Sequence, residues 1–430
     1  MHLTTFQSGK GDCLLLSNTG NKNRILIDGG MPAAYKQHVA PALGKMRDLN
    51  QKIDLVYISH IDQDHIGGVL AMLDHEVEWR VHIHQTKNGN PTHKAPKVPR
   101  PPVIDAIWHN AFHEQITKNA GDIENALAAA APVLAGADLA ELREAGLEQS
   151  GLATSIREAI QVSRRIGPNQ LGIPLNAPSK GKLLMLRDGQ KLPSIGGMSV
   201  TILGPTESHL RKLRATWNDW LRDNKKVLQA IRDSARSDEK NLTSGDVGRL
   251  FLAMRLQAEM FGNPNSVTPP NLASLTLLVE ENGPNASGHR SILLTGDARH
   301  DQIIDGLTAT GRLTNGRFDV DVLKVQHHGS ENNVDSDFVD TVIARDYVFC
   351  GNGEHENPDL RVVEMMARRR LAVDQSPFKF WFNSSSAVTE KADAIDHMEQ
   401  VEELVKKMAK SSGGRMTFKF LTSGSSMVVN

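Results

Sequence analysis

One arrangement of apolar runs occurs twice in the 430-residue chain, and it restricts the possible folds more than any other feature. Two short runs flank a turn, the second ends in an aspartate followed by a small residue, and a third run ends in histidine. The first copy is CLLLSN, RILIDGG and IDLVYISH (13–60), and the second is SLTLLVEENG, RSILLTGDA and FDVDVLKVQHHGS (274–330). Short apolar runs bounded by turn residues are typical of buried strands. The repeat predicts an α/β fold in which two similar sheet halves face one another.

Four side chains that can bind metal follow the third strand of the first copy within six residues. They are His60, Asp62, Asp64 and His65 of the stretch SHIDQDHIGG. Imidazole nitrogen with carboxylate oxygen suits zinc, manganese or iron(II). Taken alone, the stretch could also be a polar turn that caps a helix.

The second copy supplies further ligands at corresponding strand ends. Asp297 follows one strand, and the pair His327–His328 follows the next. Ligands in layered α/β proteins gather at the carboxyl ends of strands. The three groups together therefore favour a metal site over a capped turn.

In their order along the chain, five motifs resemble the metallo-β-lactamase fold family of metal-dependent hydrolases. The motifs are SGKGDCLLL, ILIDGG, SHIDQDHIGG, LLTGDA and LKVQHHGS. The nearest resemblance is to the hydrolase domain of bacterial DNA-uptake (competence) proteins. It covers residues 1–85 and about 198–358, and it implies an αββα sandwich of two similar halves.

The resemblance also implies residue roles. His60 and Asp62 belong to a first metal side, Asp64 and His65 bind a second metal, and Asp297 bridges the two. A further ligand, or a proton donor to the leaving group, is His327 or His328, and the sequence leaves both open. The full set of implied metal ligands is His60, Asp62, Asp64, His65, Asp297, His327 and His355, and the implied catalytic residues are Asp64, His327 and His328. Asp12 and Asp28 are expected to support ligands instead of binding metal themselves.

This chain departs from the family pattern at three places. Asp62 stands where the HxHxDH motif has its second histidine, and Asn357 precedes Pro358 where a histidine is usual. His355, two residues before Asn357, is the expected substitute. For the third histidine of the first site, His82, His84, His93 and His109 are candidates, with His109 beside Trp108 favoured. A site rich in carboxylates makes Mn²⁺ a candidate beside Zn²⁺ for the two expected divalent ions.

The expected function is a metal-dependent hydrolase, most directly a nuclease or phosphodiesterase that uses a metal-bound hydroxide. A second hypothesis is a hydrolase of an ester, amide or lactone, because one fold serves many chemistries. A binding or regulatory protein with a degenerate site, for example in bacterial defence, is the third.

One metallo-β-lactamase domain is expected to span residues 1–430. Helical insertions are predicted at about 100–180 and 207–262, where they could form an oligomer or partner interface, and a peripheral helix and strand at about 385–430. Within the domain, GGVLAMLDH (67–75) predicts a helix, EWRVHIHQ (78–85) a strand, and KLLMLRDGQKL (182–192) another strand.

Charge and composition bound the partners. The formal net charge is −1, so any nucleic acid, DNA first, must be held by a local basic patch. Candidate patches are HLRKLRATWNDWLRDNKK (209–226), with Trp217 and Trp220, and the loop carrying Lys87, Lys94, Lys97 and Arg100, although either could be ordinary solvated surface. No apolar run reaches the length of a membrane span and no signal peptide is evident, so a cytoplasmic protein with two free thiols, Cys13 and Cys350, is expected.

Overall fold

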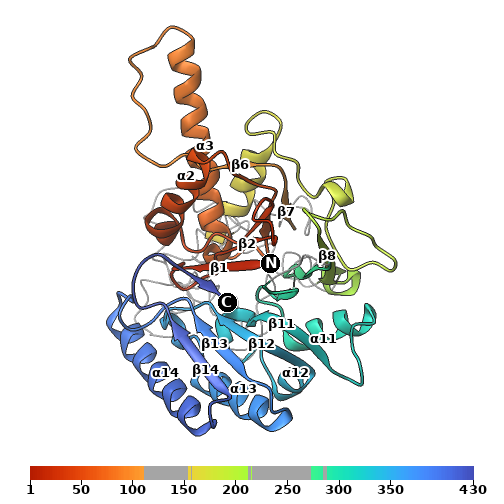
Figure 1. The fold of residues 1–430 in the computed structure, drawn as a ribbon. Coiled ribbons are helices and arrows are strands. Elements are labelled where there is room, and N and C mark those ends of the chain that lie inside the picture. Colours follow the sequence, from red (N-terminus) through yellow and green to blue (C-terminus); the bar gives the residue numbers. More distant parts are fainter. Residues whose placement is uncertain (111–153, 156, 212–214, 216–272, 284–287) are drawn as a thin grey trace, which may run out of the picture.

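The fold was analysed in a computed structural model that describes residues 1–110, 154–155, 157–211, 215, 273–283 and 288–430. Figure 1 shows two sheets at the centre, helices outside them, and one helical segment projecting from the body. Most of the predicted helical insertions and of the basic patch at 209–226, with both of its tryptophans, lie outside the described residues.

The N-terminal sheet has the strand order β15-β1-β2-β3-β5-β7 within the described chain. Its strands are β1 (His2–Phe6), β2 (Leu14–Ser17), β3 (Arg24–Ile27), β5 (Leu55–Ile58), β7 (Ile107–His109) and β15 (Ser426–Val429). A separate short ladder joins β4 (Lys52–Ile53) to β6 (Val103–Ile104).

The C-terminal sheet has the order β14-β13-β12-β11-β10-β9-β8 among the described residues. Its strands are β8 (Met198–Gly204), β9 (Thr276–Glu281), β10 (Ser291–Leu294), β11 (Phe318–Lys324), β12 (Val342–Phe349), β13 (Phe378–Phe382) and β14 (Met416–Phe420). The C-terminal end of the chain contributes an edge strand to each sheet, β14 to this one and β15 to the other.

Strand pairing shows the sequence repeat directly. β2 and β3 pair antiparallel, and β3 and β5 pair parallel. β9 and β10 likewise pair antiparallel, and β10 and β11 pair parallel. Both copies thus end with a buried parallel strand whose carboxyl end carries histidine in the following turn.

Three apolar clusters define four layers. One cluster joins the N-terminal sheet to α2 (Ala40–Asp48) and α3 (Gln63–Lys87). It contains Val56 of β5, Leu43 of α2 and Val69 of α3. A second fills the space between the two sheets, with Tyr57 and Val322 among its members. The third joins the C-terminal sheet to α11 (His300–Ala309), α12 (Ser336–Thr341), α13 (Leu360–Val373) and α14 (Ala392–Ser411). The expected α/β sandwich of two sheets between helical layers is therefore present.

The remaining short helices lie in connections. Among them are α1 (Pro32–Ala34), a π-helical turn (Tyr35–Val39), and 3-10 turns at Ala177–Ser179, Gln326–Gly329 and Glu354–Glu356.

Two strand predictions are wrong. Residues 78–85 continue α3, which runs unbroken from Gln63 to Lys87. The alternating Val81 and Ile83 suggested a strand, but Val81 is exposed and no strand in the described part of the chain pairs with this segment. Residues 182–192 contain no strand, although Leu183 to Met185 are buried. Among the described residues, no helix is both long enough and apolar enough to cross a membrane.

Candidate metal centre

Turns at the carboxyl ends of four strands converge between the two sheets. Asp28 directly follows β3, and His60 lies two residues after β5. Asp62 is the N-cap residue of α3, and Asp64 and His65 lie in its first turn. From the other sheet, the turn after β10 carries Asp297, and the 3-10 turn after β11 carries His327 and His328. Parallel pairing brings the strand ends of each half to one edge, and packing of the two sheets brings together residues that are more than two hundred positions apart in the sequence.

The carboxylate of Asp297 lies at the centre of this convergence. Its Oδ2 is 3.6 Å from His60 Nε2, 3.6 Å from His328 Nε2 and 3.7 Å from His327 Nε2. Its Oδ1 is 3.4 Å from His65 Nε2. Two ligands of one tetrahedral ion, each about 2.1 Å from it, are themselves about 3.4 Å apart. The spacing around Asp297 suits ligands that share ions better than it suits hydrogen bonds.

Two more carboxylates extend the group, one beside His60 and one beside His328. Asp62 Oδ2 is 3.5 Å from His60 Nε2. Asp64 Oδ2 is 3.2 Å from His328 Nε2. His60 and Asp62 thus form one pair, and Asp64 and His328 form another, with Asp297 between them. This is a two-sided arrangement around one central carboxylate.

The ring of His65 is oriented from behind by Asp28. Asp28 Oδ2 accepts a hydrogen bond from His65 Nδ1 at 2.9 Å, which leaves Nε2 to face Asp297. The backbone N–H and the Oγ of Ser59 each donate to Asp28 at 2.7 Å, so the carboxylate is itself fixed. A carboxylate that accepts from the back of a histidine sets its tautomer and raises its basicity towards a metal.

The other histidines are also held through Nδ1. His328 Nδ1 lies 2.7 Å from the carbonyl oxygen of Cys350 and 3.2 Å from Asp12 Oδ1. His327 Nδ1 pairs with Asn333 Oδ1 at 2.5 Å, and Asn333 donates to the Asp297 carbonyl at 2.9 Å. His60 Nδ1 pairs with Ser59 Oγ at 3.1 Å. Every ring therefore presents Nε2 to the centre.

Buried polar atoms without hydrogen bonds test whether these residues fit a metal. They include the Nε2 atoms of His60, His65 and His328, and Asp297 Oδ1. Burying such groups without partners is costly, and metal coordination would satisfy them. A compact group within the described chain, Asp12, His65, Asp297 and His328, offers ligand atoms that all lie within 4.8 Å of one another. The residues present fit a divalent cation.

Charge in the centre is balanced by protons on histidine. Burial disfavours the ionised carboxylate of Asp297, but the surrounding histidines, His65 first, hold its pKa well below the usual range. Burial also opposes the charged form of His328, but Asp297 and the neighbouring carboxylates raise its pKa to about 9. The pKa of His65 is raised in the same way, most strongly by Asp297.

Metal uptake should therefore release protons. In the metal-free protein His328 is protonated below about pH 9, and a metal needs the neutral ring, so acid competes with the ion. We expect metal affinity to rise with pH, by up to about tenfold per unit for each proton displaced, and to level off near pH 9. Calorimetry in buffers of different ionisation enthalpy counts the protons. Release of none at pH 7 would contradict this assignment, and His84→Gln, on the exposed C-terminal part of α3, should leave the count unchanged.

A buried lysine, Lys324, completes the electrostatics, and sequence reasoning did not assign it. Its ammonium group contacts the Asp12 carboxylate, donates to the Gly296 carbonyl at 3.1 Å and lies 3.7 Å from Asp297 Oδ1. Burial disfavours its charge, but Asp12 and Asp297 outweigh that effect and raise its pKa. The available signal was a lysine at the end of a strand, three residues before the histidine pair. Lys324 holds Asp12 against the backs of the metal-facing rings.

Two predicted ligands, His355 and His109, are not members of the compact group of four, and their role as ligands stays a prediction. His355 is exposed, and its Nε2 lies 3.4 Å from Lys10 Nζ. His355 also interacts electrostatically with Asp64, and the neighbouring Asn357 is the C-cap of the 3-10 turn that carries it. His109, the favoured third histidine, is buried at the end of β7 beside Ile58 and is not part of the compact group. His82 and His93 contact one another far along α3.

Close backbone contact fixes the first turn of α3 beneath the metal-facing residues. Gly29 N–H donates to the carbonyl of His65 at 2.8 Å, and Gly68 N–H donates to that of Gly30 at 2.9 Å. A Cβ on Gly68 would lie 1.9 Å from the Gly29 carbonyl oxygen, and one on Gly29 would lie 2.3 Å from Val69 N. The loop and the helix can approach this closely only because both positions are glycine.

Replacing Asp28 by asparagine should weaken metal binding without unfolding the protein. Asp28 has φ +53°, a conformation that asparagine also adopts, so the turn can persist. The amide cannot match the carboxylate as acceptor for His65 Nδ1, and loss of such support typically costs about 10–100-fold in metal affinity. Competition with a chromophoric chelator measures the change. Asp105→Asn, on a part-exposed surface ion pair, is the matched control, and equal affinity in both variants would refute the role.

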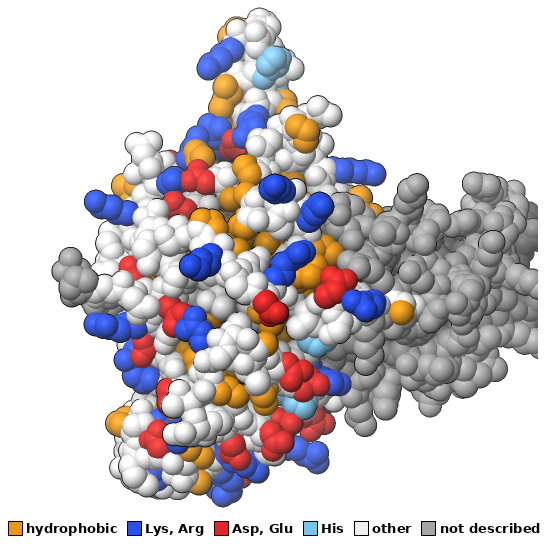
Figure 2. All heavy atoms as spheres, turned by 90° about the vertical axis from the view of Figure 1, so that its right-hand side faces the viewer, with side chains coloured by type: hydrophobic (Ala, Val, Ile, Leu, Met, Phe, Trp, Pro, Cys, Tyr) orange, Lys and Arg blue, Asp and Glu red, His pale blue; other side chains and the backbone are white. Residues whose placement is uncertain are grey.

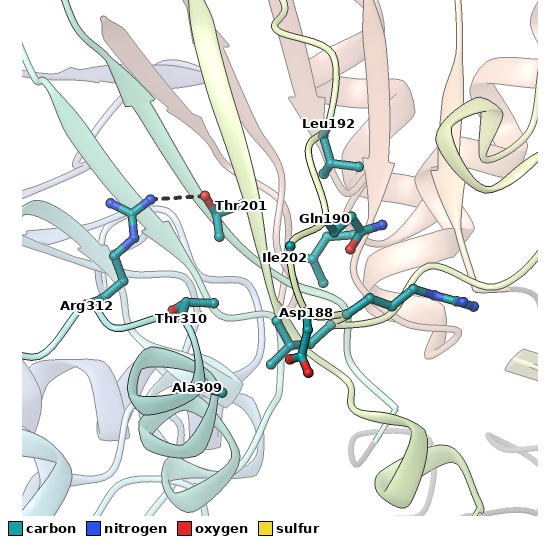
Figure 3. A pocket seen from close by; sticks show the side chains of 11 residues that line it. Asp188, Gln190, Leu192, Thr201, Ile202, Ala309, Thr310 and Arg312 are labelled. Carbon is teal, nitrogen blue, oxygen red and sulfur yellow. Dashed lines mark hydrogen bonds between the residues drawn. The ribbon is translucent and has the colours of Figure 1, made fainter.

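A second hollow exists elsewhere on the molecule. It has a volume of about 410 Å³ and lies between the segment 186–192, β8 and the end of α11. Figure 3 shows Asp188 and Arg312 at its margin, with Arg312 donating to Thr201 Oγ1 at 3.2 Å. None of its lining residues belongs to the group around Asp297, so we place no chemistry there.

Comparison with known proteins supports the same reading. Residues 9–127 match the model of the metallo-beta-lactamase superfamily. No curated protein matches the chain, and no solved structure does. Together with the α/β sandwich, the match confirms the family resemblance and the fold class, whereas the nearer resemblance to competence proteins stays a prediction. The superfamily consists mostly of hydrolases and typically binds divalent metals, so the match and the ligand group support a metal-dependent hydrolase.

Proposed function

We propose that this protein is a metal-dependent phosphodiesterase whose substrate is DNA. The observation that carries the proposal is the convergence of four histidine Nε2 atoms on Asp297, with Asp62 beside His60 and Asp64 beside His328. His60 and Asp62 would hold one divalent ion, Asp64, His65 and His328 the other, and Asp297 would contact both. Bound divalent ions would activate water and neutralise charge on the reacting oxygens.

Two neighbouring histidines, His327 and His328, have different roles in this proposal. His328 is buried and faces both Asp64 and Asp297, which suits a ligand. The His327 side chain is 27% exposed, and its Nε2 is directed at the centre while Asn333 holds Nδ1. A partly exposed ring fixed from behind can pass a proton from Nε2 to a leaving oxygen. We therefore assign ligation to His328 and proton transfer to His327.

The ligand set favours phosphodiesters over neutral acyl substrates. Asp62, Asp64 and Asp297 give the centre three carboxylates, and Asp62 replaces a histidine of the family motif. Carboxylate-rich centres suit harder ions such as Mn²⁺, which also bind phosphate oxygens well. Hydrolysis of an ester, amide or lactone is the competing function, since the same centre could polarise a carbonyl.

Metal analysis combined with cleavage assays tests the proposal. The purified protein would be loaded with Zn²⁺ or Mn²⁺ and offered plasmid, single-stranded DNA and a chromogenic ester. We expect cleavage of DNA that a chelator abolishes and that added metal restores. Ester hydrolysis without DNA cleavage would favour the second function, and failure to bind either metal would favour a degenerate-site binding protein.

A further inference from the structure

The second half of α3 and the chain that follows it form a projecting arm, defined as residues 76–102. The return segment is tied to the helix along its length. Trp79 Nε1 donates to the Val98 carbonyl at 2.9 Å, and Arg100 makes two hydrogen bonds to Glu76, each 2.9 Å. Nearer the tip, His82 and His93 join through their Nδ1 atoms at 3.1 Å. Figure 1 shows this segment projecting away from both sheets.

Beyond Glu76 and Glu78 at its base, the arm carries charge of one sign. Residues 79–104 contain no aspartate or glutamate but contain Arg80, Lys87, Lys94, Lys97 and Arg100. Arg80 and Arg100 pair with Glu76 at the base. The three lysines are exposed and have no ion pair among the described residues. Figure 2 shows basic and histidine side chains on the projecting part, with acidic side chains beginning at its base.

One continuous helix connects this charge to the metal centre. Asp64 lies in the first turn of α3, and Lys87 is its last residue. At 1.5 Å per residue, the two are about 35 Å apart along the helix axis. One turn of B-form DNA advances about 34–36 Å. A duplex that lies along α3 with a phosphate at the metal centre would therefore present the same face of its backbone near Lys87, one turn away, and would pass Lys94 and Lys97 on the return segment between the two.

We propose that the arm is a second phosphate-contact site for double-stranded DNA, spaced one helical turn from the metal centre. This inference rests on the proposed nuclease function and names its substrate as duplex DNA. Charge complementarity selects a polyanion, since Lys87, Lys94 and Lys97 have no acidic partner in the described structure. The rigid spacing by α3 selects a long regular duplex over a flexible strand. Contacts of this kind position a duplex without reading its sequence.

Binding to metal-free protein tests the arm separately from cleavage. The arm variant Lys87→Gln/Lys94→Gln/Lys97→Gln would be compared with the control Lys406→Gln/Lys407→Gln/Lys410→Gln on α14, which loses the same charge. On a duplex of about 30 base pairs, we expect the arm variant to bind about tenfold more weakly. Its salt slope should fall by about one for each lysine that contacts a phosphate, and the control should match the natural protein.

Duplex length provides the second measurement. With metal present, the arm variant should lose kcat/KM on the duplex of about 30 base pairs but not on one of about 8, which is too short to span both sites. Unchanged long-duplex binding, an equal loss in the control, or arm-dependent binding to anionic vesicles but not to duplex DNA would each overturn the proposal. Arm-dependent binding without any cleavage would overturn the nuclease function and support the arm as a DNA site.

Discussion

Asp297→Asn should abolish hydrolysis while the fold survives. The carboxylate faces the Nε2 atoms of four histidines, so its replacement removes the group that both metal positions would share. Metal ions contribute several kcal/mol to the transition state, and each 1.36 kcal/mol is tenfold in rate, so kcat/KM should fall by about 10³-fold or more. Asparagine keeps the volume and one oxygen of the original side chain. Metal content by elemental analysis and cleavage of duplex DNA measure the two effects.

Asp64→Asn should behave similarly, because Asp64 faces His328 on one side of the centre. Asp319→Asn is the matched control, since that side chain is 77% exposed on β11, and it should retain full activity and metal. Circular dichroism and thermal unfolding would show whether the variants remain folded. Undiminished cleavage by folded Asp64→Asn and Asp297→Asn would refute the assigned centre.

Lys324→Met should strongly destabilise the metal-free protein. The lysine is 2% exposed and contacts Asp12, which is 1% exposed, so its removal deprives a buried carboxylate of its nearest cationic partner. Breaking one side of a buried ion pair typically costs about 3–5 kcal/mol. Adding Asp12→Asn removes the buried negative charge, and we expect the double variant to recover part of the lost free energy of unfolding. Urea unfolding in the presence of a chelator measures all three variants.

A surface lysine provides the control for the Lys324 and Asp12 variants. Lys406 is 57% exposed and pairs with Glu402 on the same helix, and such pairs contribute about 0.3–0.5 kcal/mol. Lys406→Met should therefore change the unfolding free energy little. If Lys324→Met were no more destabilising than Lys406→Met, or if Asp12→Asn and Lys324→Met proved additive, the buried pair would not be structurally important.

The features that could be predicted from the sequence are those fixed by where the buried strands end. Asp297 and His328 lie far from His60 in the chain, but each follows a buried strand, and parallel strands carry their following turns to one edge. Apolar runs and turn residues were therefore enough to predict the sheets and the convergence. The helix after His65 was also predicted from its apolar residues, which are buried in the core.

The features that were not predicted depend on tertiary contacts, which the local sequence does not reveal. Lys324 looks like an ordinary strand-end lysine until Asp12, from another loop, is placed against it. His355 lies near the family's usual ligand position, yet its turn directs it towards Lys10. Residues 78–85 alternate like a strand, but the Trp79–Val98 hydrogen bond and the Glu76–Arg100 pair support a continued helix. Each outcome was set by a partner distant in sequence.

The glycine contact between the β3 loop and α3 bears on how this chain can diverge. A ligand position tolerates exchange between residue types that can both bind a metal, and Asp62 in place of the usual histidine is an instance. Gly29 and Gly68 have no such freedom, because any side chain at either would meet backbone within 2.3 Å. Descendants of this sequence could therefore alter their metal, and with it their chemistry, more readily than they could lose these two glycines. The backbone contact, more than the ligand set, would remain as the mark of common ancestry.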